Sequence, residues 1–296
     1  MKVFAIIVTY NPKKWIEKCF NSLLSSTIDV NIIVVDNGST DGSQELIKNL
    51  SKNIVFIQNK ENTGFGKANN IGIEAAHKQN ADYFFLLNQD AWIESNTIEK
   101  LIETSIENPD FGILSPLHYN GQGTELDLGF KYAIKLNELA ISQKTVIEVP
   151  FVNAAIWLLT RSCIEKVGGF SPVFFQYCED NNYISRLFYH QLKLGIVTNL
   201  NGFHDREFRT ENKFYQNEYK NLERDLVMTL SDPVLNLSLS KILFATLYAA
   251  IQNFIMNKTV FKINKMYLRA IFNINRKEII TFRTISKTKA NAFLDL

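Results

Sequence analysis

The amino-acid sequence predicts an α/β fold, in which a mostly parallel sheet is flanked by helices, followed by a C-terminal helical extension. Short apolar runs alternate with helical patterns through the first half of the chain, which is typical of parallel strands joined by helices. Polar clusters follow several of these runs, and beyond Ser238 only helical stripes remain. The apolar runs are Val3–Thr9, Asn31–Asp36, Ile54–Gln58, Tyr83–Leu87 and 112–116.

Between these runs, apolar residues repeat with the spacing of one helix face. Asn11 is suited to cap the first helix. The apolar stripe of that helix is Ile16, Phe20, Leu23 and Leu24. We expect a second helix to start around residues 39–41, a third near Gly66 and a fourth at Ser95. Residues 120–150 carry turn signals and a mixed pattern, which predict hairpins and loops.

Two helical stripes follow in the C-terminal extension. They comprise Leu239, Leu243, Leu247, Ile251 and Phe254, and then Val260, Ile263, Tyr267, Ile271 and Ile274. Polar residues interrupt the first stripe, so it predicts an amphipathic helix and not a membrane span, which needs about 20 predominantly apolar residues. Each stripe can dock on the preceding domain, on a partner subunit or on a membrane surface.

The charge of the chain is distributed unevenly. The 296 residues carry a net charge of +2, but nine Lys or Arg against two acidic residues give the segment after residue 256 a charge of +7. The rest of the chain therefore carries −5. This asymmetry predicts that the C-terminal segment faces an anionic surface, and composition alone does not distinguish a membrane from a nucleic acid.

Cysteine usage and the N-terminus indicate a cytoplasmic setting. Cys19, Cys163 and Cys178 are odd in number and widely separated, so we expect neither a disulfide framework nor a metal site built from them. Met1 and Lys2 lead directly into a strand-like run that is too short for a signal peptide and lacks a cleavage site. We therefore expect a cytoplasmic protein, peripheral to the inner face of the cell membrane if it binds a membrane.

Polar clusters lie where the strands of the predicted sheet end. Residues 9–11 close the first run, 36–43 the second and 88–90 the fourth, and a glycine-bearing loop at 62–70 enters the third helix. In doubly wound sheets, ligands bind beyond the carboxyl ends of the strands. We therefore expect these clusters to form one site.

In this order, the clusters resemble the nucleotide-binding half of family 2 glycosyltransferases with the GT-A fold. The family pattern has a VTYN-like first strand, a VDNGS-like second strand, an NxGFxxAxN loop and an acidic motif closing the fourth strand. The likeness continues at 167–170 and 174–180 and stops near residue 206. It implies a Rossmann-like GT-A catalytic domain at 1–235, followed by a basic, amphipathic helical region at 236–296. The halves of that domain would be a nucleotide-sugar-binding half at 1–117 and an acceptor-binding half at 118–235.

The resemblance implies a donor site for a UDP- or dTDP-linked sugar. The residues concerned are Thr9, Tyr10, Asn11, Asp36, Asn62, Gly64, Lys67, Asn88 and Asp90. Asp36 can accept a hydrogen bond from an N–H of the base, or it can cap the turn that follows. Gly64 would let the backbone approach the nucleotide closely, or it belongs to an ordinary loop.

The same resemblance implies a site for Mg²⁺ or Mn²⁺. Asp90 occupies the ligand position of a motif that often reads DxD in the family, but here the motif is Asn88-Gln89-Asp90. One carboxylate therefore remains to hold a cation that would neutralise charge on the leaving group. His204 lies where similar enzymes place a histidine that helps hold metal or diphosphate, with Arg206 or Arg209 as further phosphate partners. A lone histidine is as often structural.

Glu179-Asp180 matches the ED motif of inverting family members, in which the aspartate takes the proton of the acceptor hydroxyl. Asp180 is therefore the implied catalytic base. The family often continues as EDxD, whereas Asn182 replaces the last acid here. The pair also suits a simple helix start before Ile184 and Leu187, because acidic residues favour helix N-termini.

These assignments predict an inverting transfer of a hexose or deoxyhexose to a saccharide or lipid-linked saccharide, in polysaccharide or glycolipid synthesis. The Gln-Asp pair resembles that of some bacterial rhamnosyltransferases and favours a deoxysugar. A lipid-anchored acceptor would explain the basic C-terminal segment through an anionic membrane surface, and no nucleic acid partner is then expected. One alternative is a non-catalytic nucleotide-sugar-binding scaffold subunit, suggested by Asn88 and Asn182. Another is a nucleotidyltransferase, whose usual glycine-rich, basic first loop residues 9–12 do not match.

Overall fold

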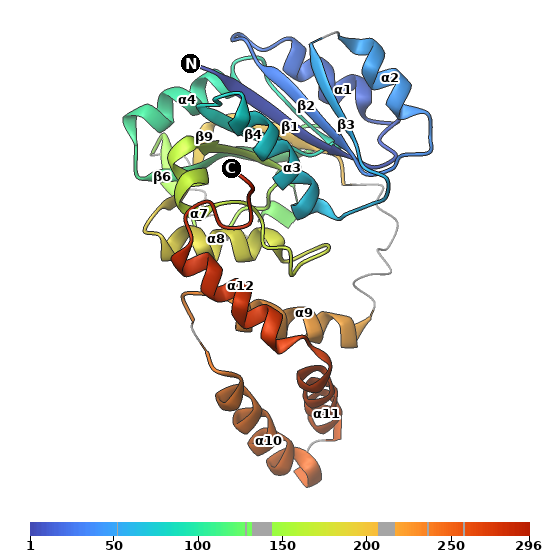
Figure 1. Ribbon diagram of the computed structural model, residues 1–296, viewed down its shortest axis with the longest axis vertical. Coiled ribbons are helices and arrows are strands. Elements are labelled where there is room, and N and C mark those ends of the chain that lie inside the picture. The colour runs from blue at the N-terminus through green and yellow to red at the C-terminus, as the bar shows by residue number, and fades with distance from the viewer. Residues whose placement is uncertain (52, 128, 132–143, 207–216, 236, 257) are drawn as a thin grey trace. The chain divides into compact units, whose positions relative to one another are not determined.

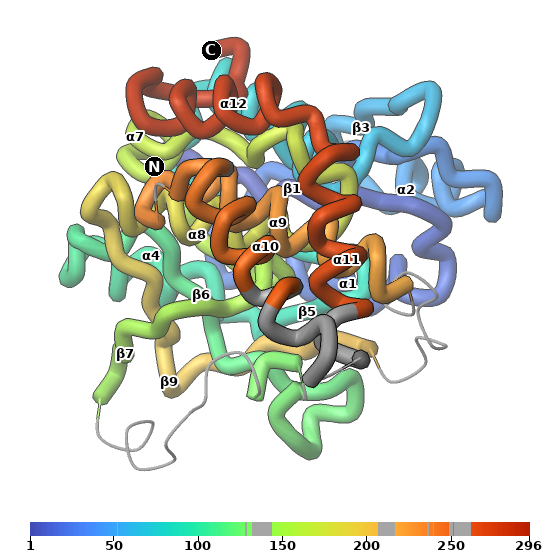
Figure 2. The backbone as a smooth tube through the Cα atoms, turned by 90° about the horizontal axis from the view of Figure 1, so that it is seen from below, coloured from blue at the N-terminus to red at the C-terminus, as the bar shows by residue number. Residues whose placement is uncertain are grey.

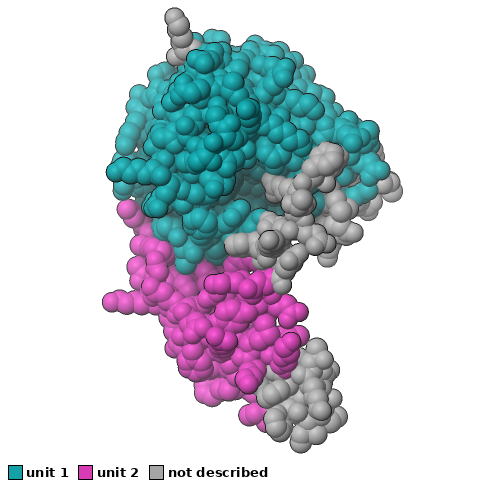
Figure 3. Space-filling model, turned by 90° about the vertical axis from the view of Figure 1, so that its right-hand side faces the viewer, with its two compact units in different colours: residues 1–208, 290–296 teal, residues 209–289 magenta. Residues whose placement is uncertain are grey.

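A computed structural model describes residues 1–296 except 52, 128, 132–143, 207–216, 236 and 257. The chain forms two compact units, one of Met1–Phe208 with Ala290–Leu296 and one of Arg209–Lys289 (Figure 3). The second unit begins at Arg209, whereas the sequence analysis placed the end of the catalytic domain at residue 235. The reason is that α9 (Glu218–Ser231) packs with the C-terminal helices α11 (Lys258–Asn273) and α12 (Arg276–Thr288).

The described residues of the first unit form a nine-stranded sheet at its centre (Figure 1). Its first half is parallel, in the order β3 (Ile54–Gln58), β2 (Asn31–Asp36), β1 (Val3–Thr9) and β4 (Tyr83–Leu87). These strands have the bounds of the first four apolar runs. The predicted α/β class with its mostly parallel sheet is thereby confirmed.

The second half of the sheet mixes strand directions. Strand β8 (Ile156–Thr160) lies between β4 and β6 (Phe111–Asn120), antiparallel to both. Strand β9 (Lys193–His204) pairs in parallel with β6 and antiparallel with β5 (Ala91–Ile93) and β7 (Val146–Glu148). β6 extends well beyond the predicted run at 112–116, because it pairs with β9 along most of its length.

Helices cover both faces of this sheet. One face packs against α3 (Phe65–Lys78), α7 (Arg161–Val167) and α8 (Glu179–Tyr189), and the other against α1 (Ile16–Leu24), α2 (Ser43–Leu50) and α4 (Thr97–Glu107). Strand β1 shows the reason in its sequence. Phe4 and Ile6 enter the first core, whereas Val3, Ala5 and Ile7 enter the second. A strand buried on both faces is a continuous apolar run.

Helix α1 begins later than the sequence predicted, and Asn11 does not cap it. Asn11 has a φ of 52°. Its N–H donates to Oγ of Ser39 at 2.9 Å, and its Oδ1 accepts from the N–H of Thr40 at 2.8 Å. Asn11 therefore links the loops that follow β1 and β2. Helix α2 likewise begins at Ser43 and not at 39–41.

In the second unit, α10 (Leu239–Met256) and α11 pack side by side (Figures 1 and 2). Two residues of the second sequence stripe, Ile271 and Ile274, are buried, whereas Ile263 is 44% exposed. Searched over the described residues, the helices include none with the length and hydropathy that crossing a membrane requires.

The C-terminal segment returns to the first unit and packs on Gly168 and Gly169. The N–H of Gly169 donates to the carbonyl of Ala292 at 2.8 Å, and Leu294 is buried in the core beside α3, α7 and α8. Gly168 has φ 83° and ψ −152°, and a Cβ at this position would overlap the backbone of Ala292. Only glycine fits both this backbone conformation and this contact.

Gly168→Ala is expected to lower the free energy of unfolding by more than about 3 kcal/mol, because it adds backbone strain and displaces the C-terminal segment. Gly42→Ala is the control. Gly42 also has a positive φ, 81°, but nothing lies within 4 Å of its Cβ position. Strain alone costs about 1 kcal/mol there. Urea unfolding of both variants measures the difference, and equal losses would contradict a constraint from the C-terminal segment.

Candidate active site

The carboxyl edge of the parallel strands carries a row of hydrogen-bonded polar side chains. The strand register pairs Thr9 with Asp36 and Asp36 with Gln58. Thr9 Oγ1 donates to Asp36 Oδ1 at 2.8 Å, and Gln58 Nε2 donates to Asp36 Oδ2 at 2.8 Å. From the following loop and α2, Ser39 Oγ donates at 2.5 Å and Gln44 Nε2 at 3.0 Å. Four segments of the chain thus converge on one carboxylate.

Asp36 is 0% exposed. Burial disfavours its ionised form, but the hydrogen bonds from Ser39, Thr9 and Gln44 outweigh burial and lower the pKa of Asp36. The carboxylate oxygens are engaged by the protein, so a nucleotide base would have to share or replace one of these donors. The sequence did not single out Gln44 or Gln58, because only helix and strand packing brings them to Asp36.

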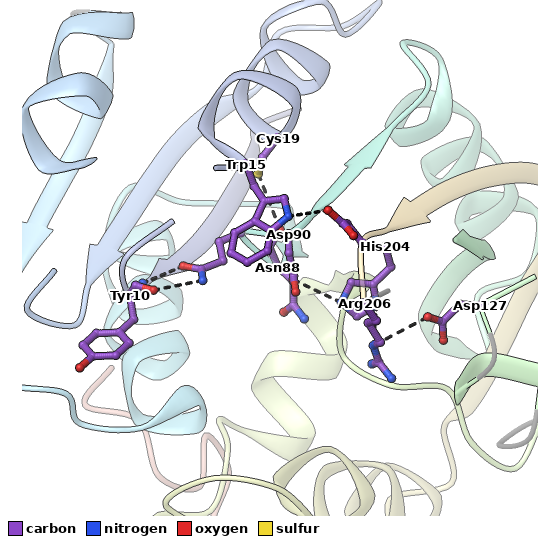
Figure 4. A network of polar contacts seen from close by, with 10 residues as sticks. Tyr10, Trp15, Cys19, Asn88, Asp90, Asp127, His204 and Arg206 are labelled. Atoms are coloured by element: carbon purple, nitrogen blue, oxygen red, sulfur yellow. Dashed lines mark hydrogen bonds and ion pairs between the residues drawn. The ribbon is translucent and has the colours of Figure 1, made fainter. Parts of the chain in front are cut away.

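Gln89, the middle residue of the Asn88-Gln89-Asp90 motif, holds the backbone of Tyr10 (Figure 4). Its Oε1 accepts from the Tyr10 N–H at 2.7 Å, and its Nε2 donates to the Tyr10 carbonyl at 3.2 Å. The end of β1 is thereby fixed against the end of β4. The N–H of Asn88 donates to the carbonyl of Ala155 at 2.8 Å. Tyr10 itself remains 49% exposed.

The glycine-bearing loop packs against the second half of the unit. Asn62 Oδ1 accepts from the N–H of Gly64 at 2.9 Å. Gly64 has a φ of 87°, and a Cβ there would overlap the carbonyl of Phe175. One close approach that requires this glycine is therefore to another loop of the protein, in addition to the approach to the nucleotide that the family resemblance implies. Asn62 and Lys67 are exposed.

Asn70 joins this loop and α3 to the Val167–Phe170 part of the motif pattern. Its Nδ2 donates to the carbonyl of Phe170 at 2.9 Å, and its Oδ1 accepts from the N–H of Phe170 at 2.7 Å. The same amide donates to the carbonyl of Phe293 at 3.3 Å. Two segments that resemble the family pattern are thus in direct contact across 100 residues of sequence.

Strands β5 and β9 bring Asp90 and His204 together (Figure 4). Their antiparallel register places Ala91 opposite His204, and Nε2 of His204 lies 3.3 Å from Oδ1 of Asp90. The two residues are 3% and 0% exposed. Within the described part of the chain, no hydrogen bond reaches His204 Nε2, while Nδ1 accepts from Nε of Arg206 at 3.1 Å.

Charged side chains continue around this pair. Asp205 Oδ2 accepts from Trp15 Nε1 at 2.8 Å and from Lys14 Nζ at 3.1 Å. Burial opposes the ionised form of Asp205, but these two hydrogen bonds outweigh it and lower its pKa. Nε of Arg206 lies 3.8 Å from Oδ2 of Asp127. Arg209, the alternative phosphate partner, lies outside the described residues.

Asp180 lies in the first turn of α8, directly after Glu179. Glu179 is buried and Asp180 is half-buried. Burial raises the pKa of Asp180, although the N–H of Asn181 and the positive charge of Arg206 lower it. An exposed acid that only starts a helix would have a lowered pKa. The shift at Asp180 has the opposite direction, because this side chain is half-buried.

Arg206 interacts with the residues around both Asp90 and Asp180. It donates to His204, and its charge acts on Asp180. His204 thus lies between Arg206 and Asp90, with Nδ1 bonded to the guanidinium Nε and Nε2 3.3 Å from the carboxylate. Among the described residues, no three His, Cys, Asp or Glu side chains form a group that could hold a metal ion.

Comparison with known families finds a match in the first half of the chain and the start of the second. Residues 4–168, more than half of the chain, match the family described as Glycosyl transferase family 2. The chain belongs to this family.

Relatives of this family 2 chain carry different names in different bacteria. The N-acetylglucosaminyl-diphospho-decaprenol L-rhamnosyltransferase of Mycobacterium tuberculosis is 25% identical over 214 residues, covering 62% of this chain and 69% of that protein. The teichoic acid poly(glycerol phosphate) polymerase of Staphylococcus epidermidis is 38% identical over 124 residues, covering 40% of this chain and 16% of the polymerase. Glycosyltransferase GlyA of Streptococcus pneumoniae is 32% identical over 110 residues, covering 36% of this chain and 15% of GlyA. The match thus spans only a small part of these last two proteins.

Among solved structures, the crystal structure of S. aureus TarS 1–349 in complex with UDP-GlcNAc is similar to this chain with a TM-score of 0.63. The match covers 97% of this chain and 84% of that chain at 14% identity. At such identity the likeness concerns the fold, and it confirms the expected GT-A architecture.

Asp36→Asn is expected to lower the free energy of unfolding by about 2 kcal/mol near neutral pH, because an amide N–H₂ would face the donors now bonded to the carboxylate. The pKa of Asp36 is lower in the folded state than in the unfolded state. The carboxylate therefore stabilises the fold above the unfolded pKa of about 4, and this contribution is lost as pH falls through the folded pKa.

The loss caused by Asp36→Asn should accordingly shrink below about pH 4. Urea unfolding at neutral and acidic pH measures it, with the exposed Asp295→Asn as control. A loss that stays constant with pH would show that Asp36 is not a stabilising carboxylate.

Proposed function

We propose that this chain is an inverting glycosyltransferase that moves a sugar from a nucleotide diphosphate to an acceptor hydroxyl in polysaccharide or glycolipid synthesis. The arrangement around Arg206 carries the proposal, since one carboxylate there has a raised pKa and the other faces a buried imidazole. Membership of family 2 supports the same reaction.

In this proposal Asp180 is the base. Its raised pKa makes the ionised carboxylate a stronger proton acceptor than an ordinary one. The acceptor hydroxyl gives its proton to Asp180 while its oxygen bonds to the anomeric carbon. The bond from that carbon to the phosphate oxygen breaks, and the electron pair leaves with the nucleoside diphosphate. A single displacement of this kind inverts the anomeric configuration. The guanidinium of Arg206 is positioned to attract the departing diphosphate.

We further propose that Asp90 and His204 hold Mg²⁺ or Mn²⁺. Mg²⁺ commonly binds through one or two protein ligands and completes its shell with water and substrate phosphates. The buried Nε2 of His204, 3.3 Å from Asp90 Oδ1 and without a hydrogen bond in the described structure, fits such a pair. A bound cation would neutralise charge on the leaving diphosphate. Ligation through Nε2 requires the ring proton on Nδ1, so Arg206 would have to move from that nitrogen.

For the donor we propose a UDP- or dTDP-linked sugar, held by the polar edge of β1, β2 and β4 and by the loop at 62–67. UDP-GlcNAc is the ligand named for TarS, and a lipid-linked acceptor is named for the mycobacterial rhamnosyltransferase. These names support a nucleotide-sugar donor and a saccharide or lipid-linked saccharide acceptor. We further propose that the reaction takes place at the cytoplasmic face of a membrane. A thermal-shift screen of such donors with and without Mn²⁺ tests the donor class, because a ligand of the native state raises its stability.

Asp180→Asn is expected to keep the fold and the donor affinity but to lower turnover by about 10² to 10⁴, the usual contribution of a general base. Glu179→Gln is the matched neighbour and should retain most of its turnover. Because burial raises the pKa of Asp180, the acid limb of kcat/KM should lie above the ordinary carboxylate pKa of about 4 and vanish in Asp180→Asn. If only Glu179→Gln loses turnover, the base is Glu179, and if neither does, the pair only starts a helix.

Asp90→Ala is expected to abolish the part of donor binding that Mn²⁺ stimulates, because it removes the carboxylate that faces His204. Calorimetric titration of the donor with and without Mn²⁺ measures this, and Asp295→Asn serves as an exposed control. Unchanged Mn²⁺-dependent binding in Asp90→Ala would refute the metal assignment. Slow Mn²⁺-dependent hydrolysis of the donor by the wild type would separate an enzyme from a scaffold subunit.

A further inference from the structure

Helix α10 exposes an apolar face in the second unit. Phe244, Leu247, Tyr248 and Ile251 are 73%, 39%, 65% and 75% exposed. Their spacing, three, four and seven residues from the first, places them on one side of the helix. We call these four residues the α10 face. Large exposed apolar side chains on one helix face mark a surface that binds another protein or a membrane.

Every charged residue in the sequence around the α10 face is basic. Between Asp232 and Glu278 it contains seven Lys or Arg and no acidic residue. Four of the basic residues are exposed on α10 and its neighbour α11, namely Lys241, Lys262, Lys265 and Arg269. An apolar helix face bordered by Lys and Arg is the combination that binds the surface of an anionic bilayer.

Packing decides which of the two helical stripes is available. Ile271 of α11 and Ile274, which follows that helix, are 0% and 8% exposed, and α11 also packs against α9. Part of the apolar surface of α11 is therefore used inside the second unit, although Ile263 and Phe272 are 44% and 68% exposed. In α10, Phe244 and Ile251 remain open. The exposed apolar side chains of α10 therefore form the more open of the two helical stripes. The charge of the sequence had instead pointed to the residues after 256.

We propose that the α10 face docks on an anionic lipid bilayer, with its four apolar side chains entering the boundary between headgroups and acyl chains. Lys241, Lys262, Lys265 and Arg269 contact the lipid phosphates. A second copy of this chain is a poorer occupant, because seven like charges on each copy would repel. The proposal deepens the proposed function, since docking brings the enzyme to a lipid-linked acceptor, but its test does not require the reaction.

The test is co-sedimentation of the full-length chain with vesicles of phosphatidylcholine alone or with phosphatidylglycerol. The wild type should bind the phosphatidylglycerol vesicles, and added salt should weaken binding because it screens exposed charges. Phe244→Ser with Ile251→Ser should lower the partition coefficient by at least about 100-fold, since it removes two large apolar side chains. Lys262→Gln, Lys265→Gln and Arg269→Gln together should lower it by roughly 100-fold. Ile106→Ser is the control, since Ile106 is 66% exposed on α4 of the first unit and should not affect binding.

Unchanged vesicle binding by Phe244→Ser with Ile251→Ser overturns the proposal, as does a wild type that ignores anionic vesicles or binds neutral ones equally well. Self-association of the wild type in light scattering that this double variant abolishes would identify an interface between copies instead. Thermal melting of each variant confirms its fold. Turnover with a soluble acceptor, measured on the same preparations, reports on the proposed function separately, because losing vesicle binding alone leaves it unchanged.

Discussion

The carboxyl edge of the parallel strands depends on one buried charge, the carboxylate of Asp36. A buried carboxylate is tolerated only when donors surround it. Here the donors come from β1, from the loop after β2, from α2 and from β3, so the charge holds four segments at one place. Asn11 and Gln89 extend the same network from β1 to the loop after β2 and to the end of β4. The edge is therefore organised by hydrogen bonds of the protein itself.

A second constraint joins α3 and the loop before it to the loop that precedes Asp180. Asn70 bonds both backbone groups of Phe170, and Gly64 lies against the carbonyl of Phe175. The fully buried Arg186 of α8 donates to the carbonyl of Gly169 at 2.6 Å and lies over the ring of Phe293, 4.8 Å from its centre. Helix α8, which carries Asp180 in its first turn, thus contacts the last residues of the chain through Arg186. A chain cut before residue 290 would lose part of the core of the first unit, so the second unit cannot be removed by simple truncation.

The two aspartates at the centre of the proposals differ because their surroundings differ. Asp36 has several donors on each oxygen, which outweigh burial and lower its pKa. At Asp180, burial outweighs the N–H of Asn181 and the charge of Arg206, so the pKa is raised. Carboxylates of one fold acquire different roles in this way, since the environment sets which form is favoured. A carboxylate whose hydrogen-bond donors outweigh burial organises structure, whereas one whose burial outweighs its donors is suited to take a proton.

Part of the candidate site could be anticipated from the sequence, because parallel strands put their carboxyl ends on one edge. Thr9 and Asp36 meet there for that reason, and the likeness of Glu179-Asp180 to a family motif drew attention to α8. No sequence pattern pointed to the other residues of the candidate site. Gln44, Gln58 and Lys14 are ordinary polar residues of their helices, strands and loops, and only packing gives them partners. Asn11 had the local features of a helix cap, but its partners, Ser39 and Thr40, lie in a loop of another strand.

The sequence by itself determined the α/β class, the bounds of the first four strands and the family. Each follows from short-range order, since strands buried on both faces are continuous apolar runs and the motifs lie at their ends. Tertiary structure decided which residues approach Gly64 and Gly168, how Asp90 meets His204, and which C-terminal helix keeps an open apolar face. These outcomes depend on strand register and on contacts between residues that can be more than 100 positions apart. A local pattern shows that a side chain is apolar or a glycine is present, but only packing determines what lies against it.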